Sequence, residues 1–441
     1  MKVKRLMSNK ILDLNRYQGF IRYFKNTSWL MAEQFLRIIA GLFIGIWVAR
    51  YLGPQEFGML SYAIAFTAIF SGVAKLGLDG IISRELINNP DEREKYLGTA
   101  FWLKVIGAII VLSLLTVIVP LANNDDSTKL FIFIISIGFV FQSFEVIEFY
   151  FQSKVLARIV AICKVTQLAL SSMIKVYLIF AKADLIWFVI VIVFDAFSLA
   201  ISYCIAYHLQ GKLIFYKKFD VNIARRVLRD SLPLMLSTIV ITIYMRIDQI
   251  MIKEMLGEYD VGIYSAAVRI SEAFYFIPLL ITASVFPAIV NARNQNKYLY
   301  ERRLQRLYTF MVWFAFSIAL PMTFLSNWLT IFLFGEAYKE AGEILMVHIW
   351  ASIFVFLGVS FSKYLIAENL TKIAFKRTFL GAISNVFLNL LLIPKYGPVG
   401  AAIATLSAQF IANLGYDIFD IQLRKQLRMK ISAIVMPWKA I

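Results

Sequence analysis

The chain contains a series of apolar stretches, each about 20 residues long, that are separated by short polar segments. A helix needs this length to cross the roughly 30 Å hydrocarbon core of a bilayer. Only 17% of the 441 residues are charged, whereas a soluble domain carries about 25%. The sequence therefore predicts an all-α polytopic membrane protein. About twelve transmembrane helices are expected, at residues 29–49, 58–78, 98–119, 130–150, 160–180, 185–207, 231–252, 262–290, 307–334, 344–366, 376–393 and 399–420.

The positive charges divide unequally between alternate connections. Counting from the N-terminal segment, alternate loops hold 32 Lys and Arg residues, and the other six loops hold one each. Cytoplasmic loops carry such an excess, so both termini are predicted to be cytoplasmic. The net charge of +17 then reflects membrane topology rather than nucleic-acid binding.

One short sequence occurs twice. Residues 52–63, LGPQEFGMLSYA, match residues 256–267, LGEYDVGIYSAA, at a shift of 204. The matches include Gly53 with Gly257 and Gly58 with Gly262, which we expect to supply backbone freedom in tight outer turns. The first copy joins spans one and two, and the second joins spans seven and eight. The chain is therefore predicted to form two six-helix bundles, as parallel repeats around a central cavity.

The loops suggest five segments. The longest internal connection is basic and partly amphipathic, which is typical of a helix at the inner headgroup surface. The predicted segments are a cytoplasmic N-terminus (1–28), an N-terminal bundle (29–207), a cytoplasmic basic linker (208–230), a C-terminal bundle (231–420) and a cytoplasmic tail (421–441).

Several charges lie within the predicted spans, where each costs about 2.5–3.5 kcal/mol and requires an interior or wet location. The predicted lining of a cationic substrate cavity is Arg37, Arg246, Arg269, Lys75 and Lys363. The candidates for ion or proton coupling are Glu33, Asp248, Glu272 and Asp195. The alternative for all of these residues is internal ion pairing or snorkelling to the interface.

Helical spacing suggests ion-pair partners for some of these charges. Glu33 with Arg37, Lys75 with Asp79, and Arg269 with Glu272 are each three or four residues apart. Asp195 has no basic neighbour in the sequence. Asp417 lies near the end of span twelve and is expected to be solvated.

The sequence lacks the motifs of nucleotide-driven pumps, serine hydrolases and metalloproteases. His208 and His348 have no metal-ligand spacing around them, so a structural role is expected for each, and neither a metal nor a cofactor is predicted. These observations favour a carrier that takes its energy from gradients or from its substrate.

Three stretches resemble the Wzx-type polysaccharide flippases of the multidrug/oligosaccharidyl-lipid/polysaccharide (MOP) exporter superfamily. They are residues 29–66, with ARYLGPQEFG as the most specific part, MRIDQIMIKEMLGEYDVGIYSAAVRISE at 245–272, and LIPKYGPVGAAIAT at 392–405. The similarity in layout covers essentially the whole chain, although only these patches are specific.

The resemblance implies alternating access and transport of undecaprenyl-pyrophosphate-linked oligosaccharide repeat units from the inner to the outer leaflet of the bacterial inner membrane. The implied protein partners are the polymerase and the chain-length regulator of the same pathway. No nucleic-acid partner is expected. Two alternatives remain open. A MATE-like cation-coupled drug antiporter would favour buried carboxylates without matched cations, and a membrane-embedded glycan polymerase or ligase would need a larger outer loop.

Overall fold

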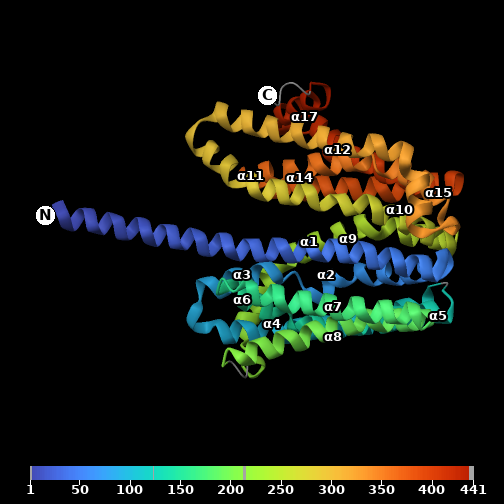
Figure 1. Ribbon diagram of the computed structural model, residues 1–441, viewed down its shortest axis with the longest axis horizontal. Helices are drawn as coiled ribbons and strands as arrows, with labels where there is room; N and C mark the ends of the chain where they lie inside the picture. Colours follow the sequence, from blue (N-terminus) through green and yellow to red (C-terminus); the bar gives the residue numbers. More distant parts are fainter. Residues whose placement is uncertain (1, 123, 212–214, 437–441) are drawn as a thin grey trace. The chain divides into compact units, whose positions relative to one another are not determined.

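The computed structural model describes residues 2–122, 124–211 and 215–436. Within these ranges the chain is almost entirely helical and contains no β-strand (Figure 1). Ten of its helical segments are long and apolar enough to cross a membrane. The all-α multi-pass fold predicted from the sequence is therefore confirmed.

Two of the ten segments contain a sharp bend. Helix α1 (Lys2–Ile69) bends at Gly53, which has φ 73° and ψ 171° and is followed by Pro54. Helix α15 (Thr371–Phe410) bends at Gly397, which has φ 59° and ψ −145° and is followed by Pro398. Glycine tolerates a positive φ, and proline fits the first turn of the helix that follows. Each bent helix therefore holds two predicted spans, so that the ten segments account for twelve.

Packing contacts divide the chain into two units. The described parts of Met1–Ile44 and Phe70–Leu236 form unit 1, and those of Gly45–Ile69 and Ser237–Ile441 form unit 2. The sequence-based division placed residues 45–69 with the N-terminal bundle. In the structure this segment, which carries the first copy of the repeated sequence, packs with the second half of the chain.

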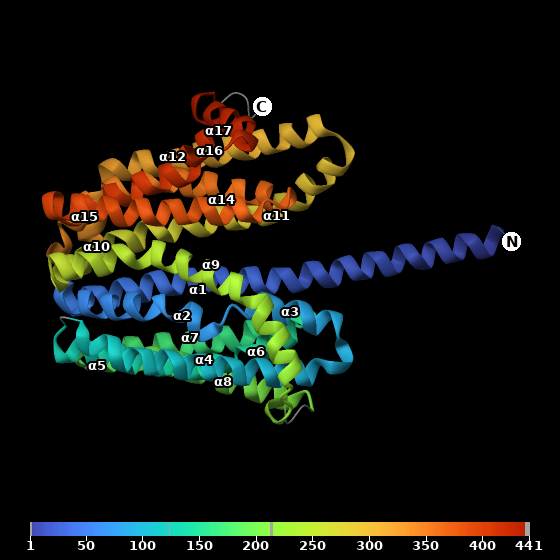
Figure 2. The same cartoon turned by 180° about the vertical axis from the view of Figure 1, so that it is seen from behind.

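Unit 1 is built from the first part of α1 and the helices that follow it. Helices α7 and α8 run side by side in this unit, as both views show (Figures 1 and 2). The further elements are α2 (Ser71–Lys75), α3 (Asp79–Asn88), η1 (Pro90–Glu92), α4 (Arg93–Leu121), α5 (Asp126–Gln142), η2 (Ser143–Glu145), α6 (Val146–Ser153), α7 (Ala157–Phe180), α8 (Leu185–Leu209), η3 (Phe215–Lys217) and the start of α9 (Val221–Met255).

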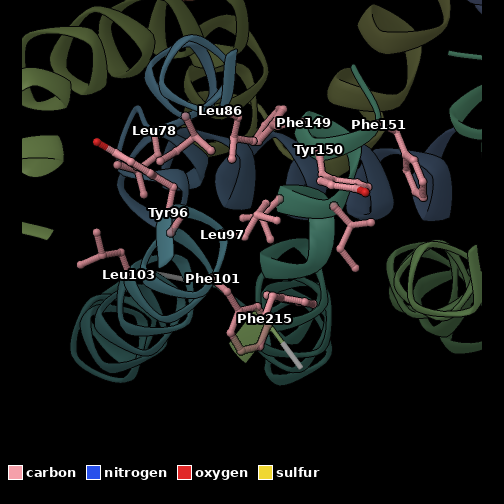
Figure 3. Packing of buried hydrophobic residues seen from close by; sticks show 14 of the residues in the cluster. Leu78, Leu86, Tyr96, Leu97, Phe101, Leu103, Phe149, Tyr150, Phe151 and Phe215 are labelled. Carbon is pink, nitrogen blue, oxygen red and sulfur yellow. The ribbon is translucent and has the colours of Figure 1, made fainter. Parts of the chain in front are cut away.

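The core of unit 1 includes a residue from the predicted linker. Phe215 is 4% exposed and packs edge-on against Phe101 and Tyr207, with ring centroids 5.6 and 5.4 Å apart (Figure 3). The Trp102 indole donates a hydrogen bond to the Tyr216 carbonyl at 2.8 Å. Burial of Phe215 therefore holds this part of the predicted linker against α4, and its position at the membrane surface stays a prediction. Residues 212–214 lie outside the described ranges.

Unit 2 combines the end of α1 with the rest of the chain. Its further elements are the second part of α9, α10 (Glu258–Glu272), η4 (Ala273–Tyr275), α11 (Phe276–Gln295), α12 (Lys297–Phe334), η5 (Glu336–Tyr338), α13 (Ala341–His348), α14 (Ala351–Ala367), α15, the π-helical turn η6 (Ile411–Gly415), α16 (Tyr416–Phe419), η7 (Ile421–Leu423) and α17 (Arg424–Val435).

Helix α17 lies in the segment predicted to be a tail. It packs against α12, and Ala433 of α17 is fully buried. The Trp313 indole donates to the Ala433 carbonyl at 3.1 Å, and the Gln305 amide donates to the Met429 carbonyl at 3.0 Å. The described part of residues 421–441 is therefore an integral layer of unit 2 rather than a free tail.

Candidate functional site

Asp248 occupies the centre of a polar cluster in unit 2. It is 5% exposed. Its carboxylate oxygens accept hydrogen bonds from the Tyr264 hydroxyl at 2.7 Å, the Thr405 hydroxyl at 2.5 Å and the Asn389 amide at 2.5 Å. All three donors are neutral, and none of the ion pairs among the described residues involves Asp248.

More oxygen atoms surround this carboxylate. Asn389 Oδ1 is buried and has no hydrogen-bond partner in the described part of the chain. Asn385 Oδ1 accepts a hydrogen bond from the Asn389 amide at 3.2 Å. Carboxylate, amide and hydroxyl oxygens are the ligands of hard cations. An ionisable residue inside a membrane costs free energy, and such residues therefore mark functional sites. This arrangement suits the retention of a monovalent cation or a proton.

Two arginines lie near one glutamate in the same unit. Arg246 Nη1 is 3.9 Å from Glu272 Oε2. The guanidinium of Arg269 lies over the Phe57 ring, 5.3 Å from its centroid. The predicted pairing of Arg269 with Glu272 is therefore replaced by one between Glu272 and Arg246.

Gly45 of α1 has no side chain and therefore leaves room for the Arg269 guanidinium. A β-carbon at Gly45 would lie 2.4 Å from Arg269 Nη1, closer than any real contact. The segment Gly45–Ile69 therefore helps to hold Arg269 in unit 2. Guanidinium groups match phosphate oxygens in a planar, bidentate geometry.

His348 is buried beside these groups, at 3% exposure. Its Nδ1 atom is 2.6 Å from the Ser271 hydroxyl oxygen, and its ring packs edge-on against Tyr264 at a centroid distance of 6.2 Å. These contacts fit the structural role expected from the sequence.

The two copies of the repeated sequence pack against each other in unit 2. A β-carbon at Gly58 would lie 1.8 Å from the Glu258 carbonyl oxygen, and one at Gly262 would lie 1.9 Å from the Pro54 carbonyl oxygen. The expectation that all four glycines serve tight turns is right for Gly53 and Gly257, which has φ 117°. It is wrong for Gly58 and Gly262, which are helical and instead allow two backbones to touch.

In unit 1 the predicted pair of Glu33 and Arg37 is confirmed, with Arg37 Nε 2.7 Å from Glu33 Oε1. The predicted pair of Lys75 and Asp79 is wrong. Lys75 Nζ lies 3.1 Å from Glu145 Oε2, while Asp79 Oδ1 lies 2.7 Å from Nζ of the buried Lys104. Leu76 and Gly77 both have a positive φ and separate α2 from α3, so helical spacing does not apply between Lys75 and Asp79.

The remaining predicted residues are also accounted for. Asp195 is paired with Lys175, whose Nζ lies 3.1 Å from Asp195 Oδ2. Lys363 Nζ lies over the Phe286 ring, 5.6 Å from its centroid. Lys363 thus belongs to unit 2, and its contact is with an aromatic face rather than with an acidic residue.

The expectation that Asp417 is solvated is wrong. Asp417 and Lys430 are both fully buried, with Lys430 Nζ 2.6 Å from Asp417 Oδ2. The same ammonium donates to the Asn413 carbonyl at 2.9 Å. Burial lowers the pKa of Lys430 to about 7. The sequence analysis counted Lys430 as a loop charge and so missed this pair. The packing of α17 against α12 depends on tertiary contacts that the local sequence does not predict.

The sequence analysis missed the neutral members of the Asp248 cluster. Asn385 and Asn389 are four residues apart in an apolar span, so their amides share one helix face. That spacing was a usable signal, whereas Tyr264 and Thr405 join the cluster only through tertiary packing. Among the described residues no group of three or more His, Cys, Asp or Glu residues could hold a metal ion.

Comparison with known proteins places these features in a family. Residues 23–293 match the family model described as "Polysaccharide biosynthesis protein", and residues 233–391 match the MatE model. The capsular polysaccharide biosynthesis protein CapF of Staphylococcus aureus is 22% identical over 407 residues, which cover 90% of this chain and 98% of that protein. The probable flippase AglR of Haloferax volcanii is 30% identical over 179 residues, covering 39% of this chain and 37% of that protein.

Solved structures share the fold. An inward-facing multidrug resistance MATE family transporter of the MOP superfamily aligns with a TM-score of 0.73 at 17% identity, covering 90% of this chain and 95% of that one. The lipid II flippase MurJ in an inward closed conformation aligns with a TM-score of 0.70 at 19% identity, covering 92% and 91%. The chain therefore belongs to the polysaccharide biosynthesis protein family and is a multi-pass membrane transporter with the MOP-superfamily fold, not a glycan polymerase or ligase.

Proposed function

We propose that this chain carries undecaprenyl-pyrophosphate-linked oligosaccharide repeat units from the inner to the outer leaflet of a bacterial inner membrane. The cargo would serve surface polysaccharide biosynthesis, and transport would proceed by alternating access with both termini in the cytoplasm. Family membership and the likeness to CapF, AglR and MurJ support a lipid-linked glycan as the cargo. A polymerase and a chain-length regulator of the same pathway would be the partners.

The observation that carries the proposal is the pair of arginines in unit 2. Arg246 and Arg269 lie in membrane-spanning helices, and of these two only Arg246 forms an ion pair among the described residues, with Glu272. A pyrophosphate could not cross hydrocarbon without compensation. Hydrogen bonds to charged groups contribute about 1.5–3 kcal/mol each, and two guanidinium groups supply several such donors for the phosphate oxygens.

In this proposal Asp248 couples transport to an ion gradient. Its cluster of oxygen atoms would bind a monovalent cation or a proton during one part of the cycle. Glu272 lies in the same unit, and both Glu272 and the substrate pyrophosphate would interact with Arg246. Binding of the ion and binding of the substrate would therefore affect each other electrostatically. Glu33 of unit 1 is held by Arg37 and would act only when that pair opens.

The test uses the purified full-length protein in proteoliposomes with a fluorescent undecaprenyl-pyrophosphate-linked oligosaccharide. Arg246→Ala and Arg269→Ala should each lower the translocation rate roughly tenfold or more, because each removes at least one charge-assisted contact. Lysine at either position should restore only part of the rate, since it lacks the planar fork. Arg293→Ala is the matched control, because Arg293 is exposed and paired with Glu368 at 3.0 Å. Wild-type rates in both site variants would refute the proposal.

A second function has one observation in its favour. Asp248 is a buried carboxylate without a matched cation, which is the feature expected of a cation-coupled drug antiporter, and the MatE model matches residues 233–391. The two functions differ in cargo. Efflux of a lipophilic cationic dye that depends on Asp248, together with no movement of the lipid-linked glycan, would support the antiporter instead.

A further inference from the structure

A mixed polar cluster joins α7 and α8 in unit 1. The Lys175 ammonium donates to the Ser171 hydroxyl oxygen at 2.8 Å and to Asp195 Oδ2 at 3.1 Å. The Gln167 amide donates to Asp195 Oδ1 at 2.9 Å. The cluster therefore contains one cation, one anion, one amide and one hydroxyl group.

The cluster lies on the faces of α7 and α8 that are opposite their strongly exposed apolar residues. Gln167, Ser171 and Lys175 follow one another at helical spacing on α7. The strongly exposed apolar residues of α7, Met173 (70%) and Tyr177 (69%), lie on the opposite face of that helix. On α8 the exposed apolar residues are likewise on a different face from Asp195, and they are Trp187, Ile190, Phe197, Ile201 and Ile205.

The Lys175–Asp195 pair is nevertheless accessible. The side chain of Lys175 is 24% exposed and that of Asp195 is 26% exposed. Asp195 lies near the middle of α8, where a charge in contact with hydrocarbon would be costly. Partial exposure of an ion pair at this depth, on helix faces without strongly exposed apolar residues, favours a polar surface beside it.

The chemistry of the cluster selects an uncharged polar ligand. An anion would be attracted by Lys175 and repelled by Asp195. A cation would be attracted by Asp195 and repelled by Lys175, so neither gains much from the pair. A sugar hydroxyl both donates and accepts a hydrogen bond, and it fits a carboxylate oxygen and an ammonium N–H that lie side by side. Ser171 and Asp195 use two of the three N–H groups of Lys175, which leaves one for a ligand.

We propose that Lys175, Asp195, Gln167 and Ser171 form a subsite of unit 1 that binds neutral sugar hydroxyls of the transported glycan. This inference rests on the proposed function and extends it, because it gives the sugar part of the cargo a binding cluster within unit 1. It also gives Asp195 a binding role in place of the ion-coupling role expected from the sequence.

The test compares two ligands of the purified full-length protein by thermophoresis. One is undecaprenyl pyrophosphate, and the other is the same lipid carrying neutral di- or trisaccharides of hexose and N-acetylhexosamine. The wild type should bind a glycosylated lipid at least roughly tenfold more tightly than the bare one, since a hydrogen bond to a charged group contributes about a factor of ten or more. The double variant Lys175→Gln/Asp195→Asn should lose this preference and keep its affinity for undecaprenyl pyrophosphate.

Two further variants separate binding from folding. The exchange Lys175→Asp/Asp195→Lys keeps the ion pair, its net charge and one donor beside one acceptor, so it should keep part of the preference, because a sugar hydroxyl can both donate and accept a hydrogen bond. Lys164→Gln/Glu148→Gln removes another ion pair of α7, which is 2.7 Å long, and should keep it.

The outcomes distinguish the two proposals. A wild-type preference retained in the Lys175→Gln/Asp195→Asn variant, or a wild type that binds both lipids equally, would overturn the sugar subsite and leave the flippase function standing. A wild type that binds neither lipid would overturn both.

Discussion

Asp248 places a carboxyl group inside the membrane-spanning part of unit 2 with only neutral hydrogen-bond donors around it. Asparagine at this position would keep most of the shape and lose the negative charge. If the cluster binds a coupling ion, Asp248→Asn should lower transport driven by an imposed sodium or proton gradient by roughly tenfold or more. Asp126→Asn, which changes a fully exposed carboxylate, should not. Imposing the two gradients separately in proteoliposomes identifies the ion, and an unchanged gradient response of Asp248→Asn would exclude the coupling role.

Lys430 predicts a pH dependence of stability. Burial lowers its pKa from 10.5 to about 7 in the folded protein. Between about pH 7 and 10.5 the unfolded chain then binds more protons than the folded one, so this residue makes the folded state more stable as pH rises through that window. Arg377 remains near Asp417 to compensate its charge after Lys430 loses its proton. The thermal midpoint of the wild type in detergent, relative to that of Lys430→Met, should rise between pH 7 and 10.

Substitutions at the same pair provide the control. Lys430→Met alone leaves Asp417 buried without its lysine and should cost about 3–5 kcal/mol at pH 6, where Lys430 is protonated. Lys430→Met/Asp417→Leu should recover much of this loss. Equal pH profiles for the wild type and Lys430→Met would show that Lys430 does not titrate in this range.

At the scale of elements, the repeat defines a corner and the helix that follows it. Gly53 and Gly257 both have a positive φ and each precedes a helix. The correspondence continues beyond the matched residues, because α1 ends at Ile69 and α10 ends at Glu272, within one residue of the same shift of 204. The two helices thus share a starting corner and an interruption about 16 residues later. This agreement supports a duplicated unit more strongly than the sequence identities alone.

The contact between the two corners gives the element-scale prediction. Gly58→Ala or Gly262→Ala should push the backbones apart, because either β-carbon would overlap a carbonyl oxygen of the other corner. Overpacking of this kind costs about 1–3 kcal/mol. The rate of disulfide formation between Gln55→Cys and Tyr259→Cys should fall in both variants. Gly41→Ala, which meets no atom within 4 Å, is the control. An undiminished crosslinking rate would show that the corners do not depend on this contact.

At the scale of the whole molecule, the charge asymmetry predicts which loops face the cytoplasm. Asp126 has a fully exposed side chain and follows span three, and Arg302 is an exposed residue of α12. In a background with Cys163 and Cys204 replaced by alanine, an impermeant thiol reagent should label Asp126→Cys in intact cells and leave Arg302→Cys unlabelled. After the membrane is permeabilised, both should react. Labelling of Arg302→Cys in intact cells would invert the predicted topology.

The sequence by itself determined the class, the number of spans and the repeat. These depend on composition, on the length of apolar stretches and on local backbone preferences, all of which act between residues close in the chain. The pair of Glu33 and Arg37 belongs to the same group, because four residues on one uninterrupted helix fix the distance between them. The turns at Gly53 and Gly257 do too, since a positive φ is a local property of glycine.

Only the tertiary structure decided which charges meet. Lys75 with Glu145, Lys104 with Asp79, and Lys175 with Asp195 join residues that lie 20 to 70 positions apart. The hydrogen-bond donors around Asp248 also come from other helices, α10 and α15. Inside a membrane a charge must find a partner or water wherever the packing of helices provides one. Helical spacing limits the candidates on one helix, and the packing of the other helices selects among them.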